Sequence, residues 1–251
     1  MGISYRYAKH ISKNGLRGLI ALLVLDTSWS LIRFIIYHAA FDGNPSNNFM
    51  TIDNIITNCL YTAFLGALAV GMFMLGIYYF KISKIGLIAS IFLIGEVGVK
   101  TAYIFFRFTQ LISQSYDDPI ILNLIQVFEM TTGFLLISTF VVFDFFQRQL
   151  KSRAGIGYGP GFLPYVFGIP ALIYPITNIL NLANVDYINT VAALPIMHML
   201  SYVAAILEII LFFDLLRRFD YMQPLQYESE DSIIYLKTAI QANKQAKILD
   251  T

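Results

Sequence analysis

Six long apolar segments constrain the fold of this chain more than any other feature of its sequence. A helix needs about 20 residues to cross about 30 Å of hydrocarbon. The chain is 57% hydrophobic and only 13% charged, whereas an average soluble domain is about a quarter charged. We therefore predict an all-α integral membrane protein with six transmembrane helices. The predicted spans cover residues 18–39, 52–80, 86–108, 119–146, 161–182 and 188–216.

The loops between these segments alternate in charge, which predicts the orientation of the chain. Lysine and arginine accumulate on cytoplasmic loops. The amino-terminal segment, the second loop, the fourth loop and the tail are basic, whereas the alternate loops contain no lysine or arginine. We therefore expect both termini in the cytoplasm. The basic residues are Arg6, Lys9, Lys13, Arg17, Lys81, Lys84, Arg148, Lys151, Arg153, Arg217, Arg218, Lys237, Lys244 and Lys247.

These predictions divide the chain into three parts. Residues 1–17 form a basic cytoplasmic segment, 18–219 a six-helix transmembrane domain, and 220–251 a cytoplasmic tail. The first span is too long for the apolar region of a signal peptide, so we expect it to be retained. Within the tail, apolar residues recur at helical spacing and predict a short amphipathic helix over 228–248. This helix either lies on the inner leaflet, binds a cytoplasmic partner, or folds back on the protein's own loops.

A weak internal repeat suggests that the six spans are three helical hairpins. The segment 11–23 resembles 82–93, and 143–150 resembles 213–219. Repeats of this kind are common in transporters, whose sites lie at the repeat interface. The alternative is that cytoplasmic helix ends share aromatic, acidic and basic residues for reasons of topology alone.

Two spans have unusual compositions. The fifth, 161–182, contains or adjoins four prolines, which kink a helix, so we expect it to bend against protein or water instead of lipid. The second contains Gly66, Gly71 and Gly76, and small residues let helices approach closely in a bilayer. We therefore predict a tightly packed face on the second span.

Ionisable residues within the spans are the candidates for function, because each costs at least about 2.5–3.5 kcal/mol to insert. The first span has Asp26, Arg33 and Tyr37 on one face. The third has Glu96, Lys100, Tyr103 and Arg107 at the same helical spacing. Glu96 and Lys100 have the favoured orientation for an intrahelical ion pair, which is the structural alternative for both residues. Arg107 is near the outer surface, where we expect it to extend toward water.

The fourth and sixth spans add Glu129, His198 and Glu208. Counting residues from the outer helix ends predicts Glu129 and His198 at roughly the depth of Glu96. Such a layer of acid, base and imidazole is suited to binding a proton or a charged solute. The structural alternatives are that Glu129 pairs with Lys100 or Arg33, and that His198 makes an interior hydrogen bond.

The candidates for a substrate or proton pathway are thus Arg33, Glu96, Lys100, Glu129, His198 and Glu208, with Asp26, Tyr37 and Arg107 as secondary candidates. We expect Asp144 to pair with Arg148 and Asp214 to pair with Arg217 at the membrane surface, outside any site.

The sequence has no pattern typical of an enzyme. Three scattered histidines are too few for a histidine-rich metal site, and Cys59 is the only cysteine. The Gly-x-Ser-x-Gly and His-Glu-x-x-His motifs are absent. We therefore expect no catalytic residue, metal or cofactor.

Two functions remain as hypotheses. The first is a small-solute or ion transporter or channel, with proton coupling included, that uses the charge layer. The second is a non-catalytic membrane subunit, assembly factor or sensory anchor of a larger complex. The expected partners are the lipid bilayer, further copies of the chain or membrane-complex subunits, and no nucleic acid.

Overall fold

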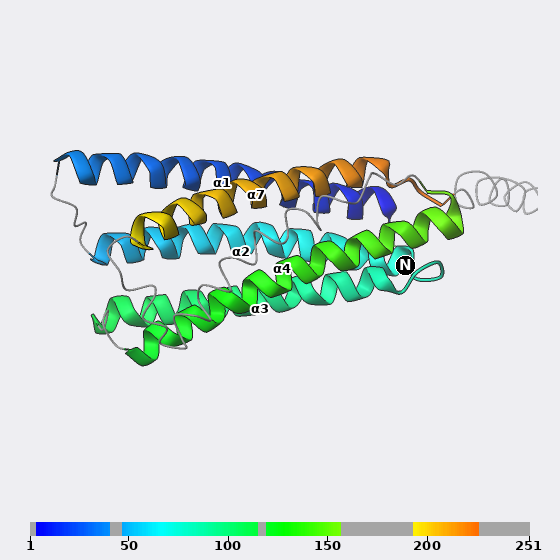
Figure 1. The fold of residues 1–251 in the computed structure, drawn as a ribbon. Helices are drawn as coiled ribbons and strands as arrows, with labels where there is room; N and C mark the ends of the chain where they lie inside the picture. The colour runs from blue at the N-terminus through cyan, green and yellow to red at the C-terminus, as the bar shows by residue number, and fades with distance from the viewer. Residues whose placement is uncertain (1–3, 41–46, 115–118, 157–192, 226–251) are drawn as a thin grey trace, which may run out of the picture.

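Five helices make up the described part of the chain (Figure 1). The computed structural model describes residues 4–40, 47–114, 119–156 and 193–225, and these ranges contain no strand. The all-helical prediction is therefore confirmed for them. The helices are α1 (Tyr5–Ala40), α2 (Asn47–Tyr78), α3 (Ile85–Ser113), α4 (Pro119–Ala154) and α7 (Ala193–Tyr221).

Four of these helices, α1 to α4, contain segments long and apolar enough to cross a membrane. They overlap the first four predicted spans, although the first begins earlier than predicted. Helix α7 overlaps the sixth predicted span, 188–216, whereas the fifth span and the tail helix lie outside the described residues. The described residues thus contain four helices that are long and apolar enough for a membrane protein, and the total of six spans stays a prediction.

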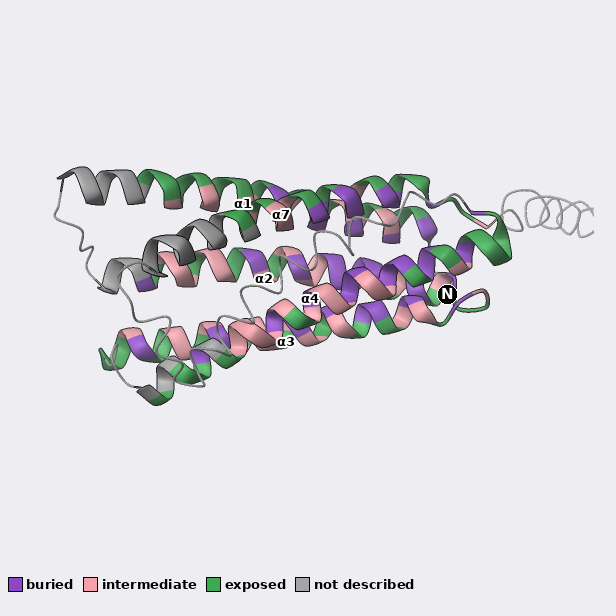
Figure 2. Ribbon diagram, viewed as in Figure 1, coloured by how far each residue is buried: buried purple, intermediate pink, exposed green. Residues whose placement is uncertain are grey.

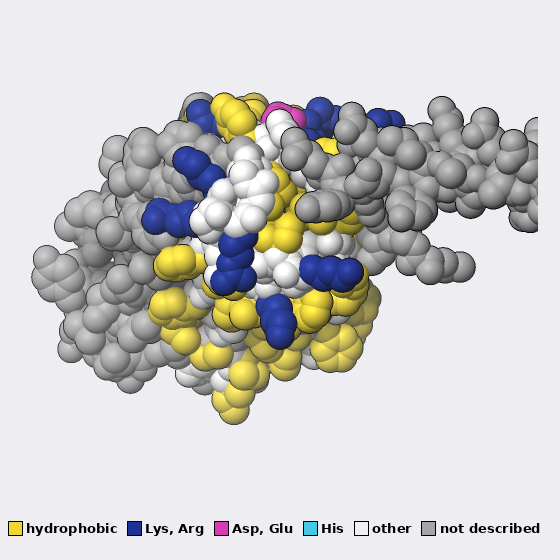
Figure 3. Space-filling model, turned by 90° about the vertical axis from the view of Figure 1, so that its right-hand side faces the viewer, with side chains coloured by type: hydrophobic (Ala, Val, Ile, Leu, Met, Phe, Trp, Pro, Cys, Tyr) yellow, Lys and Arg dark blue, Asp and Glu magenta, His cyan; other side chains and the backbone are white. Residues whose placement is uncertain are grey.

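The helices form an elongated bundle in which neighbours in sequence pack against each other. Helix α1 contacts α2, α2 contacts α3, α3 contacts α4, and α7 returns to α1. The start of α1, the turn between α2 and α3, and the ends of α4 and α7 all lie at one end (Figure 1). Viewed from that side, lysine and arginine side chains gather on this surface (Figure 3). We call it the basic end.

Helix α1 begins well before the predicted start of the first span at residue 18. Tyr5, Ala8, Ser12 and Leu16 recur at helical spacing and are all buried. The Tyr5 hydroxyl donates a hydrogen bond to the carbonyl of Met222, and Lys9 Nζ donates to the same carbonyl at 2.8 Å. These contacts with the chain after α7 explain why the basic amino-terminal residues are helical.

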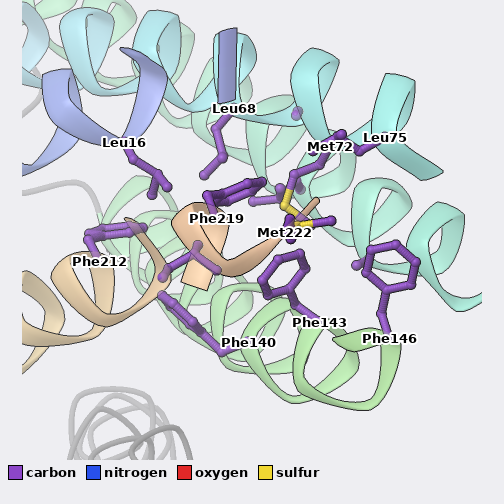
Figure 4. Packing of buried hydrophobic residues seen from close by; sticks show 14 of the residues in the cluster. Leu16, Leu68, Met72, Leu75, Phe140, Phe143, Phe146, Phe212, Phe219 and Met222 are labelled. Carbon is purple, nitrogen blue, oxygen red and sulfur yellow. The ribbon is translucent and has the colours of Figure 1, made fainter. Parts of the chain in front are cut away.

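The apolar core lies in the half of the bundle nearest the basic end. Buried residues are most frequent in that half among the residues that are described (Figure 2). Aromatic side chains of α4 and α7 meet there, with the rings of Phe143 and Phe219 stacked at 5.2 Å (Figure 4). Apolar side chains therefore fill this half of the bundle. They include Leu16, Leu68, Met72, Leu75, Phe140, Phe143, Phe146, Phe212 and Phe219.

Glycines permit two of the close helix contacts. A Cβ on Gly71 would lie 2.6 Å from the backbone nitrogen of Ser12 on α1, and one on Gly76 would lie 2.9 Å from the backbone of α3. A Cβ on Gly66 would meet nothing within 4 Å in the described part of the chain. The predicted packing role is confirmed for Gly71 and Gly76 and is wrong for Gly66.

Candidate functional site

The half of the bundle away from the basic end contains a continuous set of polar side chains, which we call the polar column. Its residues on α3 recur every three or four positions and therefore share one face. From the first to the last of them the helix rises about 21 Å. The column consists of Asn54, Asn58 and Tyr61 on α2, Glu96, Lys100, Tyr103, Arg107 and Gln110 on α3, Glu129 on α4 and Glu208 on α7.

The part of the column next to the apolar core is a pair of carboxyl groups on either side of a tyrosine. Glu96 is 1% exposed. The Tyr61 hydroxyl donates to Glu208 Oε1 at 2.9 Å and also interacts with Glu96. Glu96 Oε2 is buried and has no hydrogen-bond partner among the residues that the structure describes. Because a buried polar atom without a partner is costly, this arrangement needs an explanation beyond packing.

Lys100 does not form the predicted direct ion pair with Glu96. Its Nζ lies over two aromatic rings, 5.1 Å from the centroid of Tyr61 and 5.8 Å from that of Tyr103. Its hydrogen bond to Asn58 Oδ1 is long, at 3.4 Å. The charges of Lys100 and Glu96 still attract each other through space. The ammonium group nevertheless lies over the rings of Tyr61 and Tyr103, between the level of Glu96 and the level of Tyr103.

The part of the column farthest from the basic end is centred on Tyr103, which is 4% exposed. We call this part the outer layer. Its hydroxyl lies 3.0 Å from Asn54 Oδ1 and 3.3 Å from Glu129 Oε1, and accepts a hydrogen bond from Arg107 Nε at 3.0 Å. Arg107 also donates to Gln110 Oε1 at 3.1 Å and has Nη2 4.0 Å from Glu129 Oε1. The bonds link α2, α3 and α4 at this level.

Two predictions about this layer are corrected. Arg107 does not extend freely toward water, because Tyr103, Gln110 and Glu129 hold its side chain at 22% exposure. Glu129 lies beside Tyr103, two turns or about 10 Å along α3 from Glu96. The predicted single layer of charge is therefore two layers.

The remaining candidates lie on α1 and α7. The carboxylate of Asp26 accepts a hydrogen bond from Thr57 Oγ1 at 3.4 Å, between α1 and α2. His198 precedes Glu208 by about 15 Å of helix. The backbones of Arg33, Tyr37 and His198 are helical, but their side chains lie outside the described residues.

A second charged cluster joins α4 to α7 at the basic end. Arg218 is 2% exposed and binds Asp144 Oδ1 at 2.8 Å and Asp214 Oδ2 at 2.6 Å. Arg148 Nε binds the other oxygen of Asp144 at 2.8 Å, and Arg217 binds the other oxygen of Asp214 at 3.0 Å. We call these five residues the arginine network. The predicted pairs with Arg148 and Arg217 are confirmed, and the sequence analysis missed the buried Arg218 between them.

The tyrosine that follows α2 is also buried near the basic end. Tyr79 donates its hydroxyl hydrogen to the carbonyl of Gln223. Burial, with smaller contributions from neighbouring tyrosines, raises the pKa of Tyr79 well above its ordinary value. The phenol is therefore held in its neutral form by the fold.

The sequence analysis missed the contribution of α2 to the polar column. Asn54, Asn58 and Tyr61 follow the same spacing as the stripe on α3, and this spacing was the available signal. The glycines and alanines of the segment drew attention to packing instead.

Comparisons with protein-family models, with curated proteins and with solved structures give no match. No group of three histidine, cysteine, aspartate or glutamate residues in the described ranges is placed to hold a metal ion. The class of protein therefore follows from the fold and the polar column alone. They define a helical bundle whose helices are long and apolar enough for a membrane protein, with buried polar and charged side chains at two levels.

Proposed function

We propose that this protein is a small-solute or ion transporter or channel whose pathway follows the polar column. It has six transmembrane helices with both termini in the cytoplasm. The pathway residues are Arg33, Glu96, Lys100, Glu129, His198 and Glu208, and Asp26, Tyr37 and Arg107 support them. The observation that carries the proposal is the continuity of polar contacts from Glu208 through Tyr61, Lys100 and Tyr103 to Arg107.

The column contains more charge than packing of the helices requires. Replacing buried ion pairs by apolar residues of similar volume often leaves stability unchanged or increases it. Within the described ranges, two of the charges are also poorly satisfied: Glu96 Oε2 has no hydrogen-bond partner, and the hydrogen bond from Lys100 to Asn58 is long. In a membrane, buried ionisable groups of this kind usually face a solute or ion pathway.

Orientation gives the two halves of the bundle different roles. Lysine and arginine favour the cytoplasmic side, so the basic end faces the cytoplasm in this proposal (Figure 3). The polar column then occupies the outer half. The apolar core (Figure 4) closes the inner half together with the arginine network. A solute enters from outside and stops above the core until the inner half opens.

Thiol labelling tests whether water reaches the column. Cys59 is exposed on the surface of α2 and is the matched control for its neighbour Asn58, which contacts Lys100 inside the column. In a Cys59→Ala background, Asn58→Cys is expected to react with a charged, membrane-impermeant thiol reagent applied from outside. Native Cys59 at the same depth is expected to react much more slowly. Equal, slow labelling at both positions argues against an aqueous pathway.

Reconstitution tests transport itself. The purified chain in liposomes is expected to support a flux that depends on the pH gradient, and Lys100→Met and Glu129→Gln are each expected to reduce it. Thr101→Val is a suitable control, because Thr101 follows Lys100 but is exposed on the outside of the bundle. Normal flux in both column variants excludes them from the pathway.

The second candidate function is a non-catalytic membrane subunit, assembly factor or sensory anchor. The mutual hydrogen bonds of Tyr103, Asn54, Glu129 and Arg107 favour it, because a fixed scaffold satisfies its own polar groups in this way. The partners are then other membrane subunits or a cytoplasmic protein that binds residues 228–248. Gentle extraction followed by mass spectrometry distinguishes the two functions. Stoichiometric partners support the subunit, whereas a monomer or homo-oligomer supports the transporter.

A further inference from the structure

We infer that the carboxyl groups of Glu96 and Glu208, with Tyr61 between them, bind one exchangeable proton per chain. We call these three residues the carboxyl pair site. The inference deepens the proposed function, on which its use in coupling rests: the ion that this part of the pathway takes is a proton.

The arrangement of hydrogen-bonding groups at the site favours an additional proton. The Tyr61 hydroxyl has one hydrogen, which it donates to Glu208 Oε1 at 2.9 Å. The same hydroxyl faces Glu96, and only a protonated Glu96 has a hydrogen to donate to it. Glu96 Oε2 then remains as the carbonyl-like oxygen of a neutral acid, which costs less to bury without a partner than an oxygen of a carboxylate.

The charges at the site give the same count. Glu96 and Glu208 contribute two negative charges when both are ionised, and Lys100 is the neighbouring positive charge that acts on both. One proton makes the group of three neutral. Without it, two like charges remain close together in a site where Glu96 is 1% exposed, which is unfavourable.

Three helices place titratable groups around Glu96 in the part of the chain that the structure describes. Helix α2 contributes Tyr61, α3 contributes Lys100, and α7 contributes Glu208. The carboxylate of α4, Glu129, faces Arg107 and Tyr103 at the outer layer, and the carboxylate of α1, Asp26, faces Thr57. The balance of charge at the carboxyl pair site is therefore set by three residues.

Infrared spectroscopy of the full chain in lipid nanodiscs tests the inference without a transport assay. The C=O stretch of a protonated carboxyl group is separate from the bands of carboxylates. At neutral pH we expect a band equivalent to one protonated carboxyl, which shifts in heavy water. Glu96→Gln and Glu208→Gln are each expected to abolish the band, because Lys100 then balances the one remaining carboxylate. Glu129→Gln is the matched control and is expected to leave the band unchanged.

A third variant tests the inference through a gain of infrared signal, which a variant that merely fails to fold would not give. Lys100→Met removes the positive charge and is expected to double the band, since both carboxyl groups then take up a proton. The inference is overturned if the wild-type band is absent, or if it is unaffected by Glu96→Gln and Glu208→Gln. It is also overturned if Lys100→Met leaves the band unchanged. A band without flux in liposomes contradicts the proposed transport function and leaves proton binding intact, whereas flux without the band contradicts only the inference.

Discussion

The arginine network makes a quantitative prediction about the stability of the bundle. Arg218 is 2% exposed and binds two buried carboxylates, at 2.8 Å on Asp144 and 2.6 Å on Asp214. Removing one partner from a buried ion pair costs about 3–5 kcal/mol, because it leaves uncompensated buried charge. Asp144 and Asp214 keep their contacts with Arg148 and Arg217. We therefore expect Arg218→Gln to lower the free energy of unfolding by about 3 kcal/mol, the lower end of that range.

The two outer arginines are matched controls for this change. The side chains of Arg148 and Arg217 are 53% and 50% exposed, and each binds one of the two carboxylates that Arg218 binds, Asp144 and Asp214 respectively. Exposed ion pairs contribute about 0–1 kcal/mol. Arg148→Gln and Arg217→Gln should therefore cost at most about 1 kcal/mol each, so that the buried and exposed positions differ by about 2 kcal/mol, roughly 30-fold in the unfolding equilibrium.

Reversible unfolding in mixed micelles, titrated with a denaturing detergent, measures these differences. A second comparison separates charge from packing: Arg218→Met combined with Asp144→Asn and Asp214→Asn should recover part of the stability lost in Arg218→Met alone. If Arg218→Gln costs no more than Arg148→Gln, the reasoning from burial is wrong. Additive losses in the triple variant lead to the same conclusion.

Three further predictions concern other parts of the bundle. Gly71→Ala should lower the free energy of unfolding by about 1–3 kcal/mol, because the new Cβ would overlap α1. In thermal unfolding in detergent, Gly66→Ala should by comparison leave the free energy of unfolding unchanged or raise it by up to about 1 kcal/mol. Tyr79→Phe should lower the free energy of unfolding by about 1 kcal/mol near neutral pH. Since the fold raises the pKa of Tyr79, the wild type should also lose stability as the pH rises above about 10, the pKa of tyrosine in the unfolded chain, and the variant should lack this loss. Tyr103→Phe should cost about 1–3 kcal/mol by leaving Arg107 Nε without its hydroxyl partner, as measured by the same unfolding titration; an unchanged midpoint contradicts the assigned hydrogen bonds.

Helix positions followed closely from the sequence, because apolar length and loop charge are local properties. The starts of α3 and α4, at Ile85 and Pro119, agree with the predicted spans to within one residue. The start of α1 did not, because Tyr5 and Lys9 are held by the chain after α7, which is distant in sequence. The fifth span, 161–182, lies outside the described residues, so its predicted bend remains a prediction.

The candidate site was predicted in composition better than in geometry. Glu96, Lys100, Arg107, Glu129 and Glu208 all belong to the polar column, as insertion cost suggested. The direct pair of Glu96 and Lys100 was wrong, since spacing along one helix cannot tell which side chain of a neighbouring helix is within reach. The tyrosines that surround Lys100 instead are only partly polar, and a search for charged residues alone passes over them.

The closed inner half of the bundle leads to a final prediction about conformational change. If a solute passes along the polar column to the cytoplasm and between α4 and α7, the core there must open, because the rings of Phe143 and Phe219 are stacked against each other between these helices. The exposed side chains of the arginine network allow this movement to be blocked from outside the core. In a Cys59→Ala background, Arg148→Cys and Arg217→Cys together should be linked by a short, cleavable bifunctional thiol reagent. We expect the link to stop flux in liposomes and a reductant to restore it, whereas each single cysteine treated in the same way should transport normally. The infrared band at Glu96 should persist in the linked protein, because the site lies beyond the core. Flux that continues after complete linking would show that the pathway does not require α4 and α7 to separate, and would contradict the closed inner half proposed for this fold.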